Sequence, residues 1–407
     1  MPTPASAPIS GVSAAPARRP WLIAAALAAA VGLAALNMRT AISSVGAVLP
    51  EVQSGLGMSG SLAGLLTSLP LATYALFGAA TPWLARRTGE HTLMLAALAA
   101  LALGLWGRAA ASGPWGFLAM SAVTLMGGAV ANVALPGLIK RHFPDRIGAM
   151  TALYTTAMAV GTVVPAAATV PLALEAGWRF ALGVWALPAV VGALPWLALL
   201  RRQPRGGGSA GLGLRALARS RLAWLAAVFF GCQAMLAFIM FGWYARLLRD
   251  AGLDAPAAGV QLALLAGLGV PLALVLPGLA ARMRTQRPLL AVLAGCYLAG
   301  FLGLLAAPVA GVWAWTVLIG TGLGTFTVAL TLFALRARTP EGTAALSAFA
   351  QSTGYLIATV GPLLVGLLHD HAGGAAPVVL MIAVTCVLVA AGWAVARPRF
   401  LEDELAA

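Results

Sequence analysis

The stretch Leu36–Ser44, LNMRTAISS, places one arginine inside an apolar segment that extends from about Trp21 to Leu49. If this segment is a single helix, Arg39 lies about 27 Å along an axis of about 43 Å, far from either end. A guanidinium presents five N–H donors in a fixed planar arrangement that suits carboxylates and other small anions. Ser43 lies one turn further along the same helix face. These two side chains are therefore candidates for binding an anion.

Three kinds of partner can neutralise the charge of Arg39. A buried carboxylate is the first, but the eleven acidic residues all fall in expected loops, in the tails or in the last turn of a helix. Backbone carbonyls, or asparagine and tyrosine side chains, are the second. The third is a bound anion, and a site with one uncompensated cation in a low-dielectric cavity selects monoanions. The residues alone leave the second and third interpretations open.

Other polar side chains at mid-span positions are candidates to complete this site. Asparagine, glutamine and tyrosine hydrogen-bond bound solutes, but each can equally form a hydrogen bond between helices, which is common in membrane bundles. The candidates are Asn132, Tyr154, Gln233, Tyr244, Gln351 and Tyr355.

The composition identifies the elements that hold these residues. The chain has 407 residues, of which 61% are hydrophobic and only 9% charged, and its mean hydropathy is +0.93. Soluble domains contain about 25% charged residues, so this chain has too little polar surface to face water. Apolar runs of about 20 residues or more recur along it, and they are continuous rather than alternating, which excludes a β-barrel. We predict an all-α membrane protein.

Twelve membrane-spanning helices in two pseudo-symmetric six-helix bundles are predicted. The Gly/Ser-rich segment 201–221 has the composition of a linker and divides the chain near its midpoint. TVVPAA (162–167) and TVGPLL (359–364) are similar at corresponding places in the two halves. We therefore expect one bundle at 20–200 and a second at 222–396, a plan known among transporters. The predicted helices are 21–49, 59–85, 91–111, 115–140, 146–173, 178–200, 222–247, 256–281, 288–308, 311–335, 342–368 and 375–396.

The net charge of +14 reflects topology. Twenty of the 25 basic residues fall on one side of the predicted spans, four (Arg108, Arg179, Arg246 and Arg249) on the other, and Arg39 lies between. The positive-inside rule then places the linker and both tails, 1–19 (expected to be disordered) and 397–407, in the cytoplasm of a bacterial-type cell, with the spans in its inner (plasma) membrane. We expect contact with the lipid bilayer and none with nucleic acid. Three cysteines are expected to be buried thiols, namely Cys232, Cys296 and Cys386.

Four stretches together resemble the cyanate / 2-nitroimidazole transporter branch of the major facilitator superfamily. The resemblance covers almost the whole chain and implies the twelve-helix fold, alternating access, and a small anion or compact heteroaromatic as substrate. It implies that Arg39 binds the substrate and, less specifically, that Asn132, Tyr154 and Gln351 do so too. The stretches are LNMRTAISSVGAVLPEV (36–52), NVALPGLIKRHFPDRIGAMTALYTTAM (132–158), GWRFALGVWALPA (177–189) and ALSAFAQSTGYLIATVGPLLVGLLHD (345–370).

The loop after the second predicted helix departs from the wider superfamily. PWLARRTGEH (82–91) has Arg86 where the superfamily motif usually has an aspartate. A gating ion pair built on that aspartate is therefore not expected. We expect Asp145, on the facing loop, to pair with Arg86 or Arg87 instead.

A small-molecule anion is the substrate that these observations favour. The four histidines lie at predicted helix ends, so we expect facilitated movement or exchange rather than proton coupling through the protein. Export of a compact neutral heteroaromatic compound is the alternative, but it leaves Arg39 unexplained. The chain has no HExxH motif, no GxSxG motif and no intramembrane aspartate pair, which argues against an enzyme. We expect no cofactor or metal, and a protein that acts as a monomer.

Overall fold

The computed structural model describes residues 20–143, 146–200, 217–373 and 375–406, and these residues form helices and no strands. Eleven segments within them are long and apolar enough to cross a membrane. One of the eleven, Leu153–Leu199, has 47 residues, which is about 70 Å of helix and twice the thickness of a bilayer core. Gly177, with φ of 82°, interrupts it between the fifth and sixth predicted helices. The predicted twelve-helix fold is therefore confirmed.

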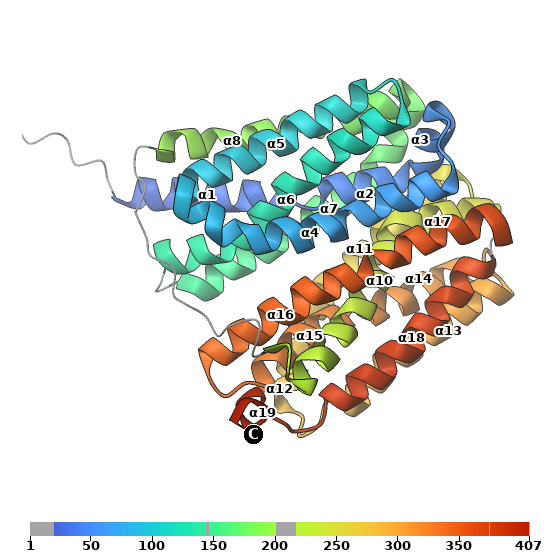
Figure 1. The fold of residues 1–407 in the computed structure, drawn as a ribbon. Coiled ribbons are helices and arrows are strands. Elements are labelled where there is room, and N and C mark those ends of the chain that lie inside the picture. The colour runs from blue at the N-terminus through green and yellow to red at the C-terminus, as the bar shows by residue number, and fades with distance from the viewer. Residues whose placement is uncertain (1–19, 144–145, 201–216, 374, 407) are drawn as a thin grey trace, which may run out of the picture.

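The helices form two bundles that face each other across the middle of the molecule (Figure 1). The N-terminal bundle consists of α1 (Pro20–Asn37), α2 (Thr40–Ala47), α3 (Leu49–Leu56), α4 (Gly60–Thr88), α5 (Glu90–Ala110), α6 (Pro114–His142), α7 (Ile147–Gly183) and α8 (Ala186–Leu199). The C-terminal bundle consists of α10 (Arg221–Asp250), α11 (Ala255–Gly267), α12 (Gly269–Arg282), α13 (Arg287–Ala306), α14 (Val312–Gly322), α15 (Thr325–Leu335), α16 (Pro340–Ala358), α17 (Val360–Ala372), α18 (Ala375–Val395) and α19 (Leu401–Ala406). The predicted helices at 21–49, 178–200, 256–281, 311–335 and 342–368 are each divided into shorter helices, which corrects those five predictions.

Prolines explain four of the helix interruptions. Proline has no N–H to donate to the carbonyl four residues earlier, and its ring clashes with that carbonyl. Pro50, Pro271 and Pro362 each follow an interruption by two or three residues, at Val48, Leu268 and Thr359 respectively. Pro188 likewise follows the interruption at Val184–Trp185 by three residues, whereas those at Leu323–Gly324 and at Met38–Arg39 have no such proline.

The two bundles are in close contact at one end, where α3 and α17 lie in Figure 1; we call this the closed end. Glycines permit the approach: a side chain added at Gly46 would collide with the carbonyl oxygen of Phe241, and one added at Gly366 would collide with that of Gly60. Asp370 of α17 accepts hydrogen bonds from the backbone N–H groups of Gly60 (2.8 Å) and Ser61 (2.8 Å), at the start of α4.

Polar contacts between the bundles add to the packing at the closed end. Arg249 of α10 forms an ion pair with Glu51 of α3 at 2.6 Å, and Arg246 donates a hydrogen bond to Gln53 at 3.2 Å. The indole N–H of Trp243 donates to Thr67 of α4 at 2.8 Å. Separation of the bundles at this end therefore requires several polar contacts to break together.

The other end carries Arg87, Arg141 and Arg338, and we call it the arginine-rich end. Among the side chains that the structure describes, none forms a hydrogen bond or an ion pair between the two bundles there. Each bundle is instead fastened within itself at this end, as by the ion pair between Arg141 and Glu90 at 3.1 Å. Among the described side chains, the polar contacts between the bundles therefore lie at the closed end.

The short acidic helix α19 stabilises the arginine-rich end of the C-terminal bundle. Glu402 accepts hydrogen bonds from the backbone N–H groups of Arg338 (2.9 Å) and Thr339 (3.1 Å), at the start of α16. Glu404 accepts from the hydroxyl of Ser220 (2.8 Å) and from a backbone N–H at the start of α10. Carboxylates are favourable at helix N-termini, where backbone N–H groups lack partners. Residues 401–406 are therefore docked on the bundle, and Leu401 is fully buried.

The outer surface of the bundles is apolar, as a lipid-facing surface requires. Large exposed side chains include Leu76, Trp106 and Leu274. Cys386 is also exposed, on α18, which corrects the prediction that all three cysteines are buried; Cys232 is buried and Cys296 is intermediate. A membrane-spanning helix has one face packed in the bundle and one face toward lipid, and a weakly polar thiol is accommodated on both.

Candidate functional site

Arg39 lies in the interruption between α1 and α2, where the chain leaves helical geometry for two residues. Polar neighbours satisfy the backbone there. The amide of Asn37 donates to the carbonyl oxygens of Leu33 (2.7 Å) and Pro188 (3.0 Å), and the hydroxyl of Thr40 donates to the carbonyl oxygen of Leu36 (3.1 Å). Such partners are what allow irregular backbone at membrane depth. The polar residues beside Arg39 therefore supply hydrogen-bond donors to backbone carbonyl oxygens around the interruption.

The guanidinium of Arg39 faces aromatic rings from both bundles. Its Cζ atom lies 5.9 Å from the ring centroid of Tyr74 on α4 and 5.5 Å from that of Phe238 on α10. The ring of Tyr355, on α16, lies 5.7 Å from that of Tyr74 and 6.4 Å from that of Phe238. Among the described side chains, none forms a hydrogen bond or ion pair with this guanidinium. The guanidinium therefore lies at the interface between the bundles, and its N–H groups have no acceptor among the described residues.

Asn132 and Tyr154 lie together beside this arginine. The hydroxyl of Tyr154, on α7, donates to the amide oxygen of Asn132, on α6, at 3.2 Å. The charge of Arg39 interacts electrostatically with the hydroxyls of both Tyr154 and Tyr355. The structure thus brings four sequence candidates, Arg39, Asn132, Tyr154 and Tyr355, into one region, and adds Tyr74 and Phe238, which were not among the candidates.

Three further candidates have local partners or none. Ser43 is buried, and its hydroxyl donates to the carbonyl oxygen of Arg39 at 3.1 Å, one turn back along α2. Gln351 donates to the hydroxyl of Ser347 at 2.7 Å on the same face of α16. Gln233 is buried on α10, and its amide oxygen has no partner among the described residues.

Tyr244 lies in the interior of the C-terminal bundle. Its hydroxyl is 2.7 Å from that of Thr316 on α14, which in turn donates to the amide oxygen of Gln261 on α11 at 2.7 Å. These three side chains link three helices and are fully or almost fully buried. Two roles were considered for Tyr244 from the sequence, substrate binding and a hydrogen bond between helices. The structure shows a hydrogen bond between helices.

The predicted gating pair falls partly outside the described residues. Asp145 is not among them, and neither is the side chain of Arg86, so their pairing stays a prediction. The guanidinium of Arg87 lies over the ring of Trp83, one turn earlier on α4, at 4.3 Å.

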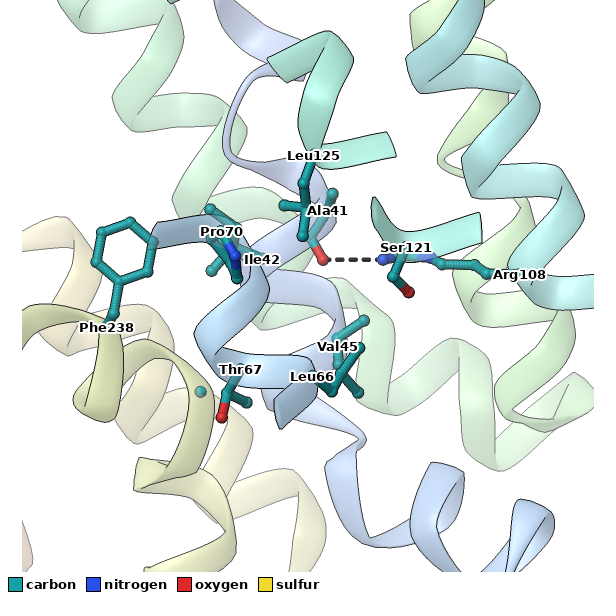
Figure 2. A pocket seen from close by; sticks show the side chains of 11 residues that line it. Ala41, Ile42, Val45, Leu66, Thr67, Pro70, Arg108, Ser121, Leu125 and Phe238 are labelled. Atoms are coloured by element: carbon teal, nitrogen blue, oxygen red, sulfur yellow. Dashed lines mark hydrogen bonds between the residues drawn. The ribbon is translucent and has the colours of Figure 1, made fainter. Parts of the chain in front are cut away.

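A fully buried arginine was missed by the sequence analysis. Arg108, on α5, is only 1% exposed, and it donates to the carbonyl oxygen of Ala41 at 3.0 Å (Figure 2) and to the hydroxyl of Ser44 at 3.1 Å, both on α2. It lies in the last turn of an apolar span, where a long basic side chain ordinarily extends to the surface. No sequence signal distinguishes it from such a residue.

Comparison with known proteins identifies the family. The sequence profile described as Major Facilitator Superfamily matches residues 27–362. The chain belongs to the major facilitator superfamily. Within this superfamily it is 36% identical to the "Uncharacterized transporter YycB" of Bacillus subtilis (strain 168), over 90% of this chain and 92% of that one. It is 32% identical to the "2-nitroimidazole transporter" of Escherichia coli (strain K12), over 89% and 93%. It is 30% identical to the "Cyanate transport protein CynX" of the same organism, over 84% and 89%.

Solved structures of other superfamily members share the fold. A bacterial homologue of the human lysosomal transporter Spinster, in an inward-facing and unoccupied conformation, has a TM-score of 0.76 at 15% identity, covering 94% of this chain and 98% of that chain. The nucleoside transporter NupG has a TM-score of 0.74 at 12% identity, covering 91% and 98%. The resemblance seen in the sequence is confirmed: the protein is a multi-pass membrane transporter of this superfamily's cyanate and nitroimidazole branch, and not an enzyme.

Proposed function

We propose that this transporter moves a small monoanion, cyanate- or carboxylate-like, by alternating access, and that Arg39 binds the anion. The observation that carries the proposal is the guanidinium of Arg39, which lies at the interface of the two bundles and contacts rings from both without any described acceptor. An unpaired charge at membrane depth is costly, and such residues commonly mark a substrate pathway.

The electrostatics favour an anion of single charge. An anion about 4 Å from a guanidinium gains about 4 kcal/mol at an effective dielectric constant of 20, before its own desolvation is subtracted. No carboxylate among the described side chains competes for Arg39. Among the described side chains, only that of Arg39 has its cation at the rings of both Tyr74 and Phe238, so a second negative charge bound there lacks a counter-charge. Monoanions are therefore favoured over dianions.

The positions of the described bundle contacts support alternating access. The closed end is held by Asp370, by the ion pair of Arg249 with Glu51 and by close glycine packing. The arginine-rich end, which the positive-inside rule assigns to the cytoplasm, has no described polar contact between the bundles. We assign this arrangement to a state open to the cytoplasm. An anion on Arg39 stabilises the states that enclose it and so shifts their populations.

The aromatic rings around Arg39 support a flat substrate. Tyr74, Phe238 and Tyr355 surround the guanidinium with apolar faces and few acceptors. One relative is described as a cyanate transport protein and another as a 2-nitroimidazole transporter, both of which handle small compounds with π-bonds. The second candidate function is therefore export of a neutral heteroaromatic compound that stacks on these rings.

Replacement of Arg39 by Gln separates the two functions. Purified protein is titrated with cyanate, formate and 2-nitroimidazole while thermal stability is measured, because a ligand that binds the folded state raises it. We expect Arg39→Gln to weaken anion binding by at least about 30-fold, the equivalent of about 2 kcal/mol for losing one partner of a buried charge pair. Binding of 2-nitroimidazole is expected to change little.

The matched control is Arg287→Gln. Arg287 also lies over an aromatic ring, that of Trp393 at 5.1 Å, but it is at the arginine-rich end and within the C-terminal bundle. It should leave every titration unchanged. Unaltered anion affinity in Arg39→Gln overturns the proposal, and binding of 2-nitroimidazole alone, in both variants, establishes the second function instead.

Exchange or facilitated movement is proposed rather than proton coupling. Uptake of an anion of a strong acid into proteoliposomes is measured at zero membrane potential, with and without a pH gradient. We expect equal uptake in both conditions, since the described residues offer no carboxylate beside Arg39 to carry a proton. Accumulation driven by the pH gradient contradicts this part of the proposal.

A further inference from the structure

Arg108 is a buried cation whose hydrogen-bonding capacity is largely unused. It is 1% exposed, and of its five N–H groups one on each terminal nitrogen is engaged, with Ala41 and Ser44. Its Nε atom has no partner among the described residues, and no described carboxylate forms an ion pair with it. Both acceptors are neutral, so the charge of Arg108 is as uncompensated as that of Arg39.

Arg108 lines a small, partly open cavity (Figure 2). The cavity has a volume of about 20 Å³ and is bounded by α2, α4, α5, α6 and α10. Ser121 of α6 also lines it, is 1% exposed, and has a hydroxyl with no partner among the described residues. Two unpaired polar groups thus border one cavity. Its volume admits one water-sized particle, and cavities that remain empty are apolar, unlike this one.

The cavity lies at the interface between the bundles, next to the site of Arg39. Phe238 of α10 lines the cavity, and the same ring lies 5.5 Å from Cζ of Arg39. On the C-terminal side of Phe238, Gly242 also lines it and packs against Thr67 of α4, where the bundles meet towards the closed end. Separation of α10 from α2 and α4 would therefore open the cavity towards that end.

We propose that Arg108 and Ser121 form a second anion site, separate from Arg39, which takes a small inorganic monoanion of halide size. The guanidinium supplies charge and N–H donors, and the hydroxyl of Ser121 supplies one more donor. The anion compensates a buried charge whose isolation costs several kcal/mol. The volume excludes a carboxylate while the end stays closed. When that end opens, an entering anion passes this site before it reaches Arg39.

Halide titration in an Arg39→Gln background tests this site without the other. Thermal stability of the purified protein is measured against sodium bromide, with sodium gluconate keeping the ionic strength constant. We expect a saturable rise in melting temperature that persists in Arg39→Gln. Adding Ser121→Val, which removes the hydroxyl and fills the cavity while keeping the arginine, should weaken the apparent bromide affinity at least tenfold. Adding Arg108→Gln should abolish the response.

The control is Ser68→Val in the same background. The hydroxyl of Ser68 is also buried and without a described partner, but this residue does not line the cavity, so the bromide response should remain. If Arg108→Gln fails to fold, Ser121→Val decides the outcome by itself. A bromide response that is absent in Arg39→Gln, or that Ser121→Val leaves unchanged, overturns the proposal and leaves a water molecule as the occupant. Neither result bears on binding at Arg39.

Discussion

Asp370 offers the sharpest test of how the closed end is held. Its carboxylate lies on α17 and accepts three hydrogen bonds from the first turn of α4: from the backbone N–H groups of Gly60 and Ser61 at 2.8 Å each, and from the hydroxyl of Ser61 at 2.9 Å. All three cross between the bundles, so they exist only while this end is closed. Loss of the charge should therefore shift the equilibrium between the two transport states.

The magnitude follows from the number and exposure of these bonds. A hydrogen bond to a charged group contributes about 1.5–3 kcal/mol, and a neutral one about 0.5–1.5 kcal/mol. Asp370→Asn keeps one acceptor oxygen and turns an amide towards a backbone donor. Because the side chain is exposed, the lower part of the range applies. We expect a shift of about 1–2 kcal/mol, or about 5- to 30-fold, towards the state open at this end.

Spin-label distances measure this shift directly. In a background in which Cys232, Cys296 and Cys386 are replaced by alanine, labels at Ser54 and His371, which are both exposed, report the separation of the bundles at the closed end. Pulsed electron–electron double resonance should show a longer distance between the labels, with a population that increases in Asp370→Asn.

Asp254→Asn is the matched control for this experiment. Asp254 also accepts a hydrogen bond at a helix N-terminus, from the backbone N–H of Ala257 at 2.7 Å, but entirely within the C-terminal bundle. It should lower stability slightly and leave the distances as they are. Identical distance distributions for Asp370→Asn and the unaltered protein refute the reasoning, as do equal changes in the two variants.

Two further predictions concern packing and pH. Gly366→Ala places a methyl group against the carbonyl oxygen of Gly60 and should populate the longer distance, whereas Gly295→Ala, with no neighbouring atom within 4 Å, should leave the distances unchanged and add up to about 1 kcal/mol of helix stability. Burial disfavours ionisation of Glu402, but hydrogen bonds from backbone N–H groups at the start of α16 outweigh this and hold its pKa below its usual 4.5. The stability that Glu402 contributes is therefore present above pH 4.5 and is lost as the pH falls through its lowered pKa, so the melting temperature of Glu402→Gln should fall less than that of the unaltered protein between about pH 5 and pH 3. Equal slopes in that pH range contradict this assignment.

The sequence predicted the spans well because membrane helices must satisfy their own backbone and be apolar over a fixed length. It also contained the reason for four helix interruptions, since Pro50, Pro188, Pro271 and Pro362 each remove a helical hydrogen bond. The interruption at Arg39 has no such cause within the helix. Beside it the amide of Asn37 donates to the carbonyl oxygen of Pro188, 151 residues away, and tertiary contacts of this kind are not visible in local sequence.

The candidate site was predicted in part for the same reason. Arg39 was identified because a charge at the centre of a long apolar run is conspicuous. Arg108 was not, because at the end of a span the same residue type ordinarily reaches the surface. Tyr74 and Phe238 were not singled out either, since aromatic rings are common in apolar helices. Which rings meet the guanidinium is decided by how α4 and α10 pack.

The docking of α19 has a consequence for how the protein is made. The first turns of α10 and α16 take their carboxylate acceptors from residues 402 and 404, which leave the ribosome long after Ser220 and Thr339 have done so. Until then these two helix starts have only the serine and threonine hydroxyls as acceptors. The last six described residues thus complete the C-terminal bundle during biosynthesis. A nascent chain that ends before them would contain every membrane-spanning segment but would lack the carboxylate acceptors at the starts of α10 and α16.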